Sequence, residues 1–206
     1  MIIRVGIVDD HPLVVSGLEL ALAKAADVEI VARGGTAAEA REILAREDVD
    51  VLLLDVRLPD GNGLAMLSDV TTGRRCPVLV LSSYQTAQYV AAAVRFGAQG
   101  FMLKTAPIDD LLAAIRRVAD GGAAFSADQL REGTAKLVRL TPREREILRL
   151  VVDGRTNEEI GAAMGTSHKT VEAHLTHMYE RFGIASRVEL ALRAERDGWL
   201  EIGSSG

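Results

Sequence analysis

Short apolar runs alternate with amphipathic stretches along the first part of the chain. The runs are rich in Val, Ile and Leu, as is typical of parallel strands buried on both faces. We expect strands at Arg4–Asp9, Val28–Ala32, Val51–Asp55, Val78–Ser82 and Gly100–Lys104. The stretches between them have helical spacing, and we expect helices at Pro12–Ala25, Thr36–Arg46, Gly63–Thr71, Thr86–Phe96 and Ile108–Asp120. This alternation predicts an α/β domain with a doubly wound, five-stranded parallel sheet.

The strand signals stop after Asp120, and helix-start signals replace them. Thr141 precedes a proline and, three positions on, a glutamate, and the same threonine- or serine-to-glutamate spacing recurs from Thr156 and Ser186. We therefore expect a second, all-α domain of four short helices. The predicted limits are residues 1–120 for the first domain, 121–138 for a linker with a helical turn or more at Asp128–Lys136, and 139–202 for the second domain. We expect Gly203–Gly206 to be disordered.

Charge and cysteine content narrow the function classes. The net charge is −5, and residues 139–206 hold ten Lys and Arg against eleven Asp and Glu, a net −1. A nucleic-acid site must therefore depend on where charges lie and not on a basic excess. A single cysteine excludes an internal disulfide framework and a multi-cysteine zinc site. No bilayer-spanning apolar stretch or secretory signal is visible, so we expect a cytoplasmic protein.

Charged residues end three of the predicted strands. Asp9 ends the first and Asp10 follows it, Asp55 ends the third and Lys104 ends the fifth. Sites in open parallel sheets form at the carboxyl ends of the strands, so these four residues should converge. Crowded carboxylates repel each other unless a hard cation lies among them, and Mg²⁺ takes such oxygen ligands. A carboxylate beside a metal and an ammonium group is a candidate phosphate acceptor.

Two further features belong to this edge of the sheet. The segment after Asp55 contains Pro59 and Gly61, which predict a turn that folds the Arg57 carbonyl back toward the acids. Ser82 ends the fourth strand, where its hydroxyl can reach a phosphoryl oxygen.

Five separated elements carry a resemblance, in this order: Val8-Asp9-Asp10, Asp55, Leu58-Pro59-Asp60-Gly61, Ser82 and Gly100-Phe101-Met102-Leu103-Lys104. Together they resemble the receiver domain of two-component response regulators over residues 2–120. The resemblance implies a flavodoxin-like fold and phosphorylation of Asp55 by a sensor histidine kinase.

The resemblance also implies a role for each neighbour of Asp55. Asp10 would bind Mg²⁺ directly and Asp9 through water, with Asp55 and the Arg57 backbone carbonyl completing the protein ligands. Lys104 would bind a phosphoryl oxygen. Ser82 and Phe101 would be the switch residues, while Arg57 and Tyr84 occupy positions that tune phosphate lifetime.

The segment His168–Phe182 follows Ser167, a predicted helix N-cap. Val171, Leu175, Met178 and Phe182 have helical spacing along one face, and the opposite face is polar. Such a helix can lie in the major groove of DNA, although an ordinary surface helix has the same pattern.

The motifs that favour DNA binding are Leu140-Thr141-Pro142-Arg143-Glu144, Thr156-Asn157-Glu158-Glu159-Ile160-Gly161, Lys169-Thr170-Val171-Glu172-Ala173-His174-Leu175 and Ser186-Arg187-Val188-Glu189-Leu190. They resemble the LuxR-type helix-turn-helix over residues 139–200, and with the receiver they make the chain similar to the NarL/FixJ group. By this resemblance, base-facing positions are Glu172, Ala173 and Thr176, and phosphate contacts are Lys169, Thr170, His177 and Arg187. Several relatives have lysine at positions 172 and 176; glutamate at 172 can instead accept a hydrogen bond from cytosine N4.

We therefore interpret the chain as a transcription factor rather than an enzyme. A kinase would phosphorylate Asp55, the protein would form a homodimer, and the dimer would bind double-stranded promoter DNA. One alternative is an aspartyl phosphatase, but such enzymes carry Asp-x-Asp at the nucleophile, whereas here Asp55 is followed by Val56 and Arg57. A second alternative is a phosphorylation-independent regulator that uses the receiver for dimerisation.

Overall fold

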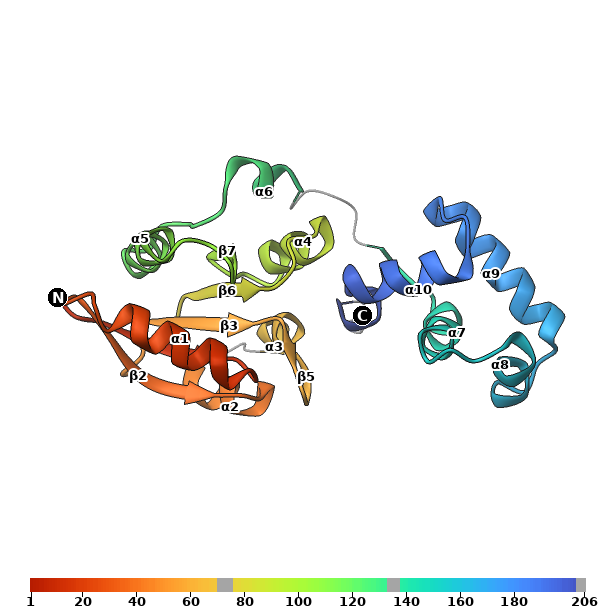
Figure 1. Cartoon of the computed structure of the whole chain (residues 1–206), viewed down its shortest axis with the longest axis horizontal. Coiled ribbons are helices and arrows are strands. Elements are labelled where there is room, and N and C mark those ends of the chain that lie inside the picture. Colours follow the sequence, from red (N-terminus) through yellow and green to blue (C-terminus); the bar gives the residue numbers. More distant parts are fainter. Residues whose placement is uncertain (70–75, 133–137, 203–206) are drawn as a thin grey trace. The chain divides into compact units, whose positions relative to one another are not determined.

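The computed structural model describes residues 1–69, 76–132 and 138–202. Within these ranges the chain forms two compact units, one up to residue 132 and one from residue 138 (Figure 1). Residues 121–132, which lie in the predicted linker, belong to the first unit. The predicted tail Gly203–Gly206 lies outside the described residues.

The first unit is built on a parallel sheet, which confirms the predicted fold class. Its order is β2-β1-β3-β6-β7, with bounds β1 Ile3–Val8, β2 Val28–Gly34, β3 Val51–Asp55, β6 Val78–Ser82 and β7 Gly100–Leu103. All four neighbouring pairs are parallel, and every residue of β3 and β6 is buried. The order reverses direction beside β1 and β3, the position where open α/β sheets form their sites.

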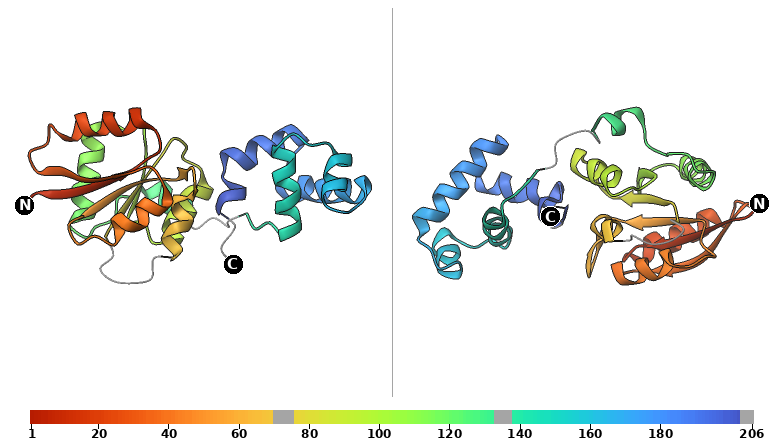
Figure 2. Two further views of the ribbon diagram at one scale, coloured as in Figure 1. Left: turned by 90° about the horizontal axis from the view of Figure 1, so that it is seen from below. Right: turned by 180° about the vertical axis from the view of Figure 1, so that it is seen from behind.

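Helices cover both faces of this sheet (Figure 2). Their bounds are α1 Pro12–Leu22, α2 Ala37–Leu44, α3 Gly63–Asp69, α4 Ala87–Arg95 and α5 Ile108–Ala119. Leu22 of α1 and Ile115 of α5 share one apolar core with Val5 and Leu53 of the strands. Thr71, the predicted end of α3, lies outside the described residues.

The segment after Asp55 contains the predicted turn. It forms a short antiparallel hairpin of β4 (Arg57–Leu58) and β5 (Gly61–Asn62). At its tip, the Asp60 carboxylate accepts hydrogen bonds from the backbone amides of Ala37 at 2.6 Å and Ala38 at 3.0 Å. The hairpin is thereby tied to the first turn of α2, whose free amides favour an anion.

A further short helix, α6 (Ala127–Glu132), packs on the first unit. It overlaps the helical turn expected in the linker at Asp128–Lys136. The backbone just before it pairs with the sheet edge, where Ala124 and Gly100 form an isolated parallel bridge.

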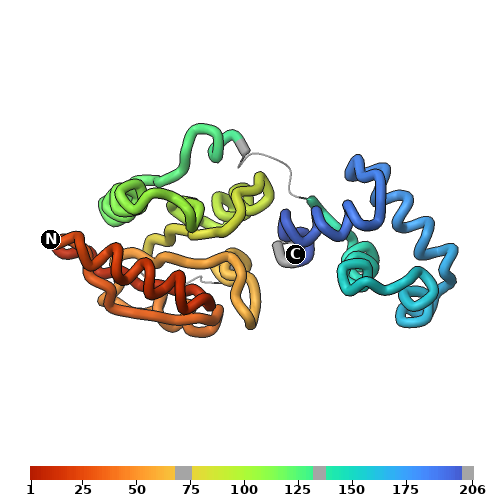
Figure 3. The backbone as a smooth tube through the Cα atoms, in the orientation of Figure 1, coloured from red at the N-terminus to blue at the C-terminus, as the bar shows by residue number. Residues whose placement is uncertain are grey.

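The second unit contains the four predicted helices and one short addition. Their bounds are α7 Pro142–Val152, α8 Asn157–Ala163, α9 His168–Phe182, α10 Arg187–Arg196 and α11 Trp199–Ile202 (Figure 3). Their core contains Ile147, Ile160 and Leu190. The turn between α8 and α9 is tight, since a Cβ at Gly161 would lie 2.8 Å from the Thr166 carbonyl oxygen.

The predicted capping boxes are realised in different ways. Those at Thr141 and Thr156 are complete, with side chain and backbone bonded reciprocally. At Ser186 the hydroxyl accepts from the Glu189 amide as expected, but the Glu189 carboxylate accepts from the Ala185 amide, one residue before the N-cap. Thr36, at the start of α2, has the same arrangement with Glu39 and Gly35. Among the helices described in both units, none has the length and apolar character that a membrane span requires.

Gly63, at the start of α3, lies against the backbone of Asp55 at the end of β3. We predict that Gly63→Ala disrupts this contact. A Cβ at this position would lie 2.2 Å from the Asp55 carbonyl oxygen, so the end of β3 or the start of α3 must move. We expect a loss of about 1–3 kcal/mol in the free energy of unfolding, measured by urea denaturation.

The control is Gly17→Ala in α1, where a Cβ meets no atom within 4 Å. This change should raise stability by up to about 1 kcal/mol because alanine favours the helix. Equal stability of Gly63→Ala and the wild type would contradict the close packing described.

Candidate functional site

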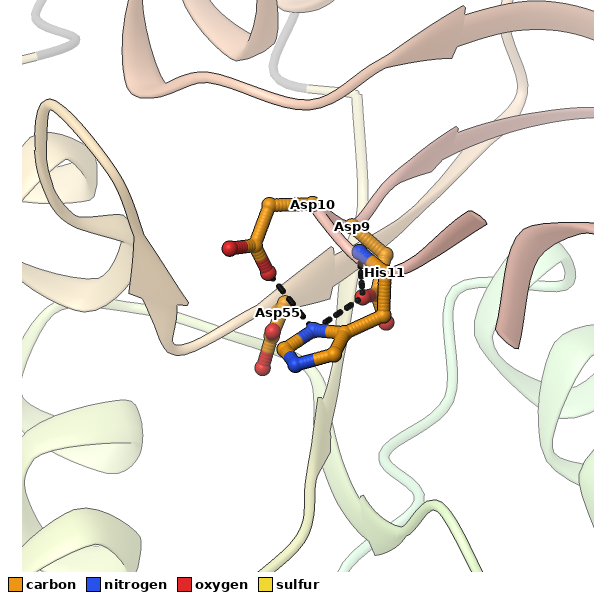
Figure 4. A group of neighbouring side chains, drawn as sticks. All are labelled: Asp9, Asp10, His11 and Asp55. Atoms are coloured by element: carbon orange, nitrogen blue, oxygen red, sulfur yellow. Dashed lines mark hydrogen bonds and ion pairs between the residues drawn. The ribbon is translucent and has the colours of Figure 1, made fainter. Parts of the chain in front are cut away.

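The acidic residues predicted to converge lie together at the carboxyl edge of the sheet. One ligand atom from each of Asp9, Asp10, Asp55 and His11 lies within 4.8 Å of the others (Figure 4). Asp9 and Asp10 directly follow β1, while Asp55 is the last residue of β3. Asp9 and Asp55 are buried, at 5% and 4% exposure, and Asp10 is exposed. The fourth member, His11, is not among the residues predicted from sequence.

Lys104 joins the two buried acids. Its Nζ lies 2.8 Å from Asp55 Oδ2 and 2.6 Å from Asp9 Oδ2. The bond to Asp55 has good hydrogen-bond geometry, whereas Asp9 Oδ2 has no hydrogen-bond partner among the described residues despite the short ion pair. Two buried carboxylates thus share one ammonium group, which leaves a negative excess at this edge.

That excess and the type of donors fit a hard divalent cation. The carboxylate oxygens of Asp9, Asp10 and Asp55 lie close enough to share one ion, and Asp9 Oδ2 has bonding capacity to spare. Oxygen donors of this kind suit Mg²⁺. The role of the Arg57 backbone carbonyl as a further ligand stays a prediction.

The site shifts the pKa values of its charged groups. Desolvation by burial raises the pKa of the Asp55 carboxyl above 3.8, and the charge of Asp9 adds to this, although the hydrogen bond and charge of Lys104 oppose it. Desolvation lowers the pKa of Lys104, but the hydrogen bond to Asp55 and the negative charges of Asp55 and Asp9 outweigh it, and the net pKa is raised. Lys104 is therefore a cation at neutral pH.

The two predicted switch residues are buried beside this edge. Ser82 ends β6 at 3% exposure, and its Oγ accepts a hydrogen bond from the Tyr84 amide at 3.2 Å. Phe101 in β7 is 1% exposed, so its ring lies inside the unit. In this conformation the Ser82 hydroxyl interacts with its own loop.

Arg57 joins a contact that the sequence did not reveal. Its Nε donates to the hydroxyl of Tyr89 in α4 at 3.2 Å, and its guanidinium carbon lies 5.7 Å from the centre of the Tyr84 ring. The two side chains predicted to tune phosphate lifetime therefore contact each other. Tyr89 is an ordinary aromatic residue of an amphipathic helix in the sequence, and only the fold places it against Arg57.

In the second unit, α9 presents the predicted polar face. Its buried side is formed by Val171, Leu175 and Met178. Six of the seven predicted DNA contacts are exposed on this helix: Lys169, Thr170, Glu172, Ala173, Thr176 and His177.

The seventh predicted contact, Arg187, lies in a different setting. At the start of α10, its guanidinium donates to Asn157 Oδ1 at 2.9 Å and to the Arg155 carbonyl. The side chain thus connects α10 to the start of α8, and its predicted phosphate contact would have to be made alongside these bonds.

The sequence matches two family models, one in each unit. Residues 5–116 match the response regulator receiver domain, and residues 138–194 match the bacterial regulatory proteins of the luxR family. The chain is a response regulator. It combines a receiver domain with a LuxR-type DNA-binding domain, in a family of transcription regulators.

Relatives of the same organisation match over nearly the whole response regulator. The transcriptional regulatory protein UhpA of Escherichia coli K12 is 35% identical over 198 residues, which is 96% of this chain and 100% of UhpA. The nitrate/nitrite response regulator NarL of the same strain is 32% identical over 201 residues, 90% of this chain and 92% of NarL. The crystal structure of the response regulator ChrA of a heme-sensing two-component system has a TM-score of 0.57 and 28% identity, covering 96% and 98% of the two chains. The chain is thus of the NarL/FixJ type, as predicted.

The raised pKa of Asp55 predicts that Asp55→Asn stabilises the resting protein at neutral pH. A folded-state pKa above the unfolded value means that ionisation costs stability, and this cost appears as the pH rises above 3.8. In the absence of Mg²⁺ we expect the free energy of unfolding of the variant to be about 1 kcal/mol higher than that of the wild type at pH 7, a difference that narrows as the pH falls toward 3.8.

Asp60→Asn is the matched control with the opposite sign. The amides of Ala37 and Ala38 lower the pKa of Asp60 below 3.8, so its ionised form stabilises the fold above that pH and the stabilisation is lost as the pH falls. This variant should be less stable than the wild type at pH 7. A destabilised Asp55→Asn at pH 7 would contradict the electrostatic description of the site.

Proposed function

We propose that this response regulator is switched by phosphorylation of Asp55 and then binds promoter DNA as a homodimer. The observation that carries the proposal is the arrangement of Asp55, Asp9 and Lys104. A buried carboxylate at the end of a central strand is paired with an ammonium group at 2.8 Å, beside a second buried acid with spare bonding capacity. A structural salt bridge would need only one of the two acids.

The reaction is a phosphoryl transfer from a phosphohistidine of a sensor kinase. The phosphorus–nitrogen bond breaks, a bond forms between phosphorus and an Asp55 carboxylate oxygen, and the freed imidazole stays on the kinase. Mg²⁺ held by Asp9, Asp10, Asp55 and the Arg57 carbonyl would offset the charge gathered among the acids and the phosphoryl group. Lys104 is already within hydrogen-bond distance of Asp55 and needs little movement to bind a phosphoryl oxygen.

The readout we propose is a shift between two conformations of the receiver. To donate to the phosphoryl group, the Ser82 hydroxyl would move toward Asp55, away from the loop whose Tyr84 amide now donates to it at 3.2 Å. Phe101, which is buried beside the same edge, would act as the switch aromatic residue and respond to this change. Nearly complete switching, from 1:99 to 99:1, requires differential binding of about 5.5 kcal/mol between the two states.

Helix α9 is the element we propose to enter the major groove. Its exposed face places Glu172, Ala173 and Thr176 toward bases and Lys169, Thr170 and His177 toward phosphates. Support comes from the buried Val171–Leu175–Met178 side, which fixes the orientation of the helix within its unit.

The proposed dimer contact is α10. Val188 and Leu192 lie one turn apart on this helix, with 68% and 61% exposure. Adjacent exposed apolar residues favour burial against a second copy, and two-fold symmetry would present two α9 helices to half-sites about ten base pairs apart. We propose that the protein acts in the cytoplasm, where promoter DNA lies.

The role of Asp55 predicts that Asp55→Asn abolishes labelling by acetyl phosphate in the presence of Mg²⁺. The amide oxygen is too weak a nucleophile to form the acyl phosphate. Intact-protein mass spectrometry measures the label. Asp110→Asn is the control, since Asp110 is an exposed acid of α5 and should keep wild-type labelling. Retained labelling of Asp55→Asn would show that the acceptor is another residue.

Two substitutions on α9 should separate affinity from base preference. We expect Lys169→Ala to weaken binding to all sequences alike and to reduce the salt-dependence slope by about 1, because one phosphate contact is lost. Glu172→Gln should change the preferred base at one position by about 1–3 kcal/mol. Selection of bound DNA followed by affinity measurement at several salt concentrations tests both.

Glu180→Gln removes the same charge as Glu172→Gln two turns further along α9. It should leave base preference unchanged. If Glu172→Gln and Glu180→Gln select the same DNA as the wild type, position 172 does not face a base.

A further inference from the structure

Gln129 is a buried polar residue that the proposed phosphorylation mechanism does not use. It lies in α6 and is only 6% exposed, unlike most residues of that short helix. Its backbone amide donates to Ser126 Oγ at 3.1 Å, and its Oε1 accepts from the Ser126 amide at 2.8 Å. These two bonds cap the first turn of α6 in the manner of a capping box.

The other end of the Gln129 side chain bonds to the receiver. Its Nε2 donates to the Phe101 carbonyl of β7 and to Gln85 Oε1, each at 3.1 Å. An amide nitrogen has two donor hydrogens, so both are used. One side chain thus joins α6 to the residue predicted as the switch aromatic and to the loop that follows the predicted switch serine.

The backbone before α6 adds to this attachment. The Ala124 amide donates to the Gln99 carbonyl at 2.7 Å, and the Phe101 amide donates to the Ala124 carbonyl at 3.3 Å. Gly100 permits the approach, because a Cβ there would lie 2.8 Å from Ala124 Cβ. This pairing fixes the start of the segment to the sheet, whereas Gln129 fixes the helix itself.

The two partners of Gln129 differ in how they would respond to phosphate. The Phe101 carbonyl oxygen that accepts from Gln129 lies in β7, where pairing with β6 holds the backbone. Gln85 belongs to the loop between Ser82 and α4, and the Ser82 hydroxyl holds this loop through the Tyr84 amide. Movement of Ser82 toward a phosphoryl group would break that bond and displace Gln85.

We propose that Gln129 latches helix α6 onto the resting receiver, and that phosphorylation of Asp55 weakens the latch by withdrawing Gln85. Gln85 is exposed but Gln129 is buried, so loss of Gln85 removes one of the two acceptors of the Gln129 amide and weakens its hold on α6. The chain leads from α6 into the DNA-binding unit. Release of α6 therefore loosens the covalent connection between the receiver and that unit. This inference rests on the proposed function.

The test is hydrogen exchange of residues 124–132 in the full-length protein, followed by mass spectrometry. The resting wild type should show protected amides in this segment. Addition of acetyl phosphate and Mg²⁺ should speed their exchange about tenfold, the effect of losing one hydrogen bond. The fraction of phosphorylated protein is measured in the same sample.

Gln129→Glu separates the latch from the stability of the helix. Glutamate has nearly the same shape and its carboxylate can still accept from the Ser126 amide, so the cap on α6 persists, but both donors to Phe101 and Gln85 are lost. We expect fast exchange of the segment without phosphate and no further increase with it. Gln85→Ala removes only the mobile partner and should give the same loss of phosphate response.

Leu130→Ala is the control on the same helix, since Leu130 is 51% exposed and is not part of the latch. It should keep both the resting protection and the phosphate response. Wild-type protein that is phosphorylated yet shows unchanged exchange in residues 124–132 would overturn the latch while leaving the proposed function intact. Absence of phosphorylation at Asp55 would overturn the proposed function itself.

Discussion

The ion pair that Lys104 makes with Asp9 and Asp55 is the constraint on which the receiver depends. Three strands, β1, β3 and β7, deliver these residues to one edge, and the resulting cluster holds two buried acids with one cation. Breaking a buried pair by removing one partner typically costs about 3–5 kcal/mol, so the lysine is a structural requirement as well as a phosphate ligand in our proposal. Burial of the Asp55 carboxylate has an electrostatic cost, which raises the pKa of its carboxyl and which binding of Mg²⁺ would relieve.

Local sequence signals were enough to predict the structural features that depend on the ends of single strands or helices. Charged residues at strand ends predicted that Asp9, Asp10, Asp55 and Lys104 would meet, because parallel strands end at a common edge. The alternating apolar runs predicted the fold class, which the structure and the relatives confirm. The functional role of each site residue stays a prediction, since geometry places side chains without showing what they bind.

The contacts missing from the sequence interpretation are those between elements far apart in the chain. Tyr89 against Arg57 and Gln129 against Phe101 join residues 32 and 28 positions apart. No period or motif marks Gln129, a glutamine in a segment predicted as linker. The capping pattern at Ser186 was predicted correctly in part, since its hydroxyl accepts from the Glu189 amide but the Glu189 carboxylate accepts from the Ala185 amide. Arg187 likewise has partners that the motif did not indicate.

The central claim is that phosphate on the receiver controls DNA binding by the other unit. It is tested most directly by measuring the affinity of the full-length protein for its selected DNA site, with and without acetyl phosphate and Mg²⁺, at one fixed salt concentration. The account predicts tighter binding by the phosphorylated protein and no such change in Asp55→Asn. Identical affinity of the phosphorylated and resting wild-type protein would contradict it and would favour a regulator whose receiver serves only for dimerisation.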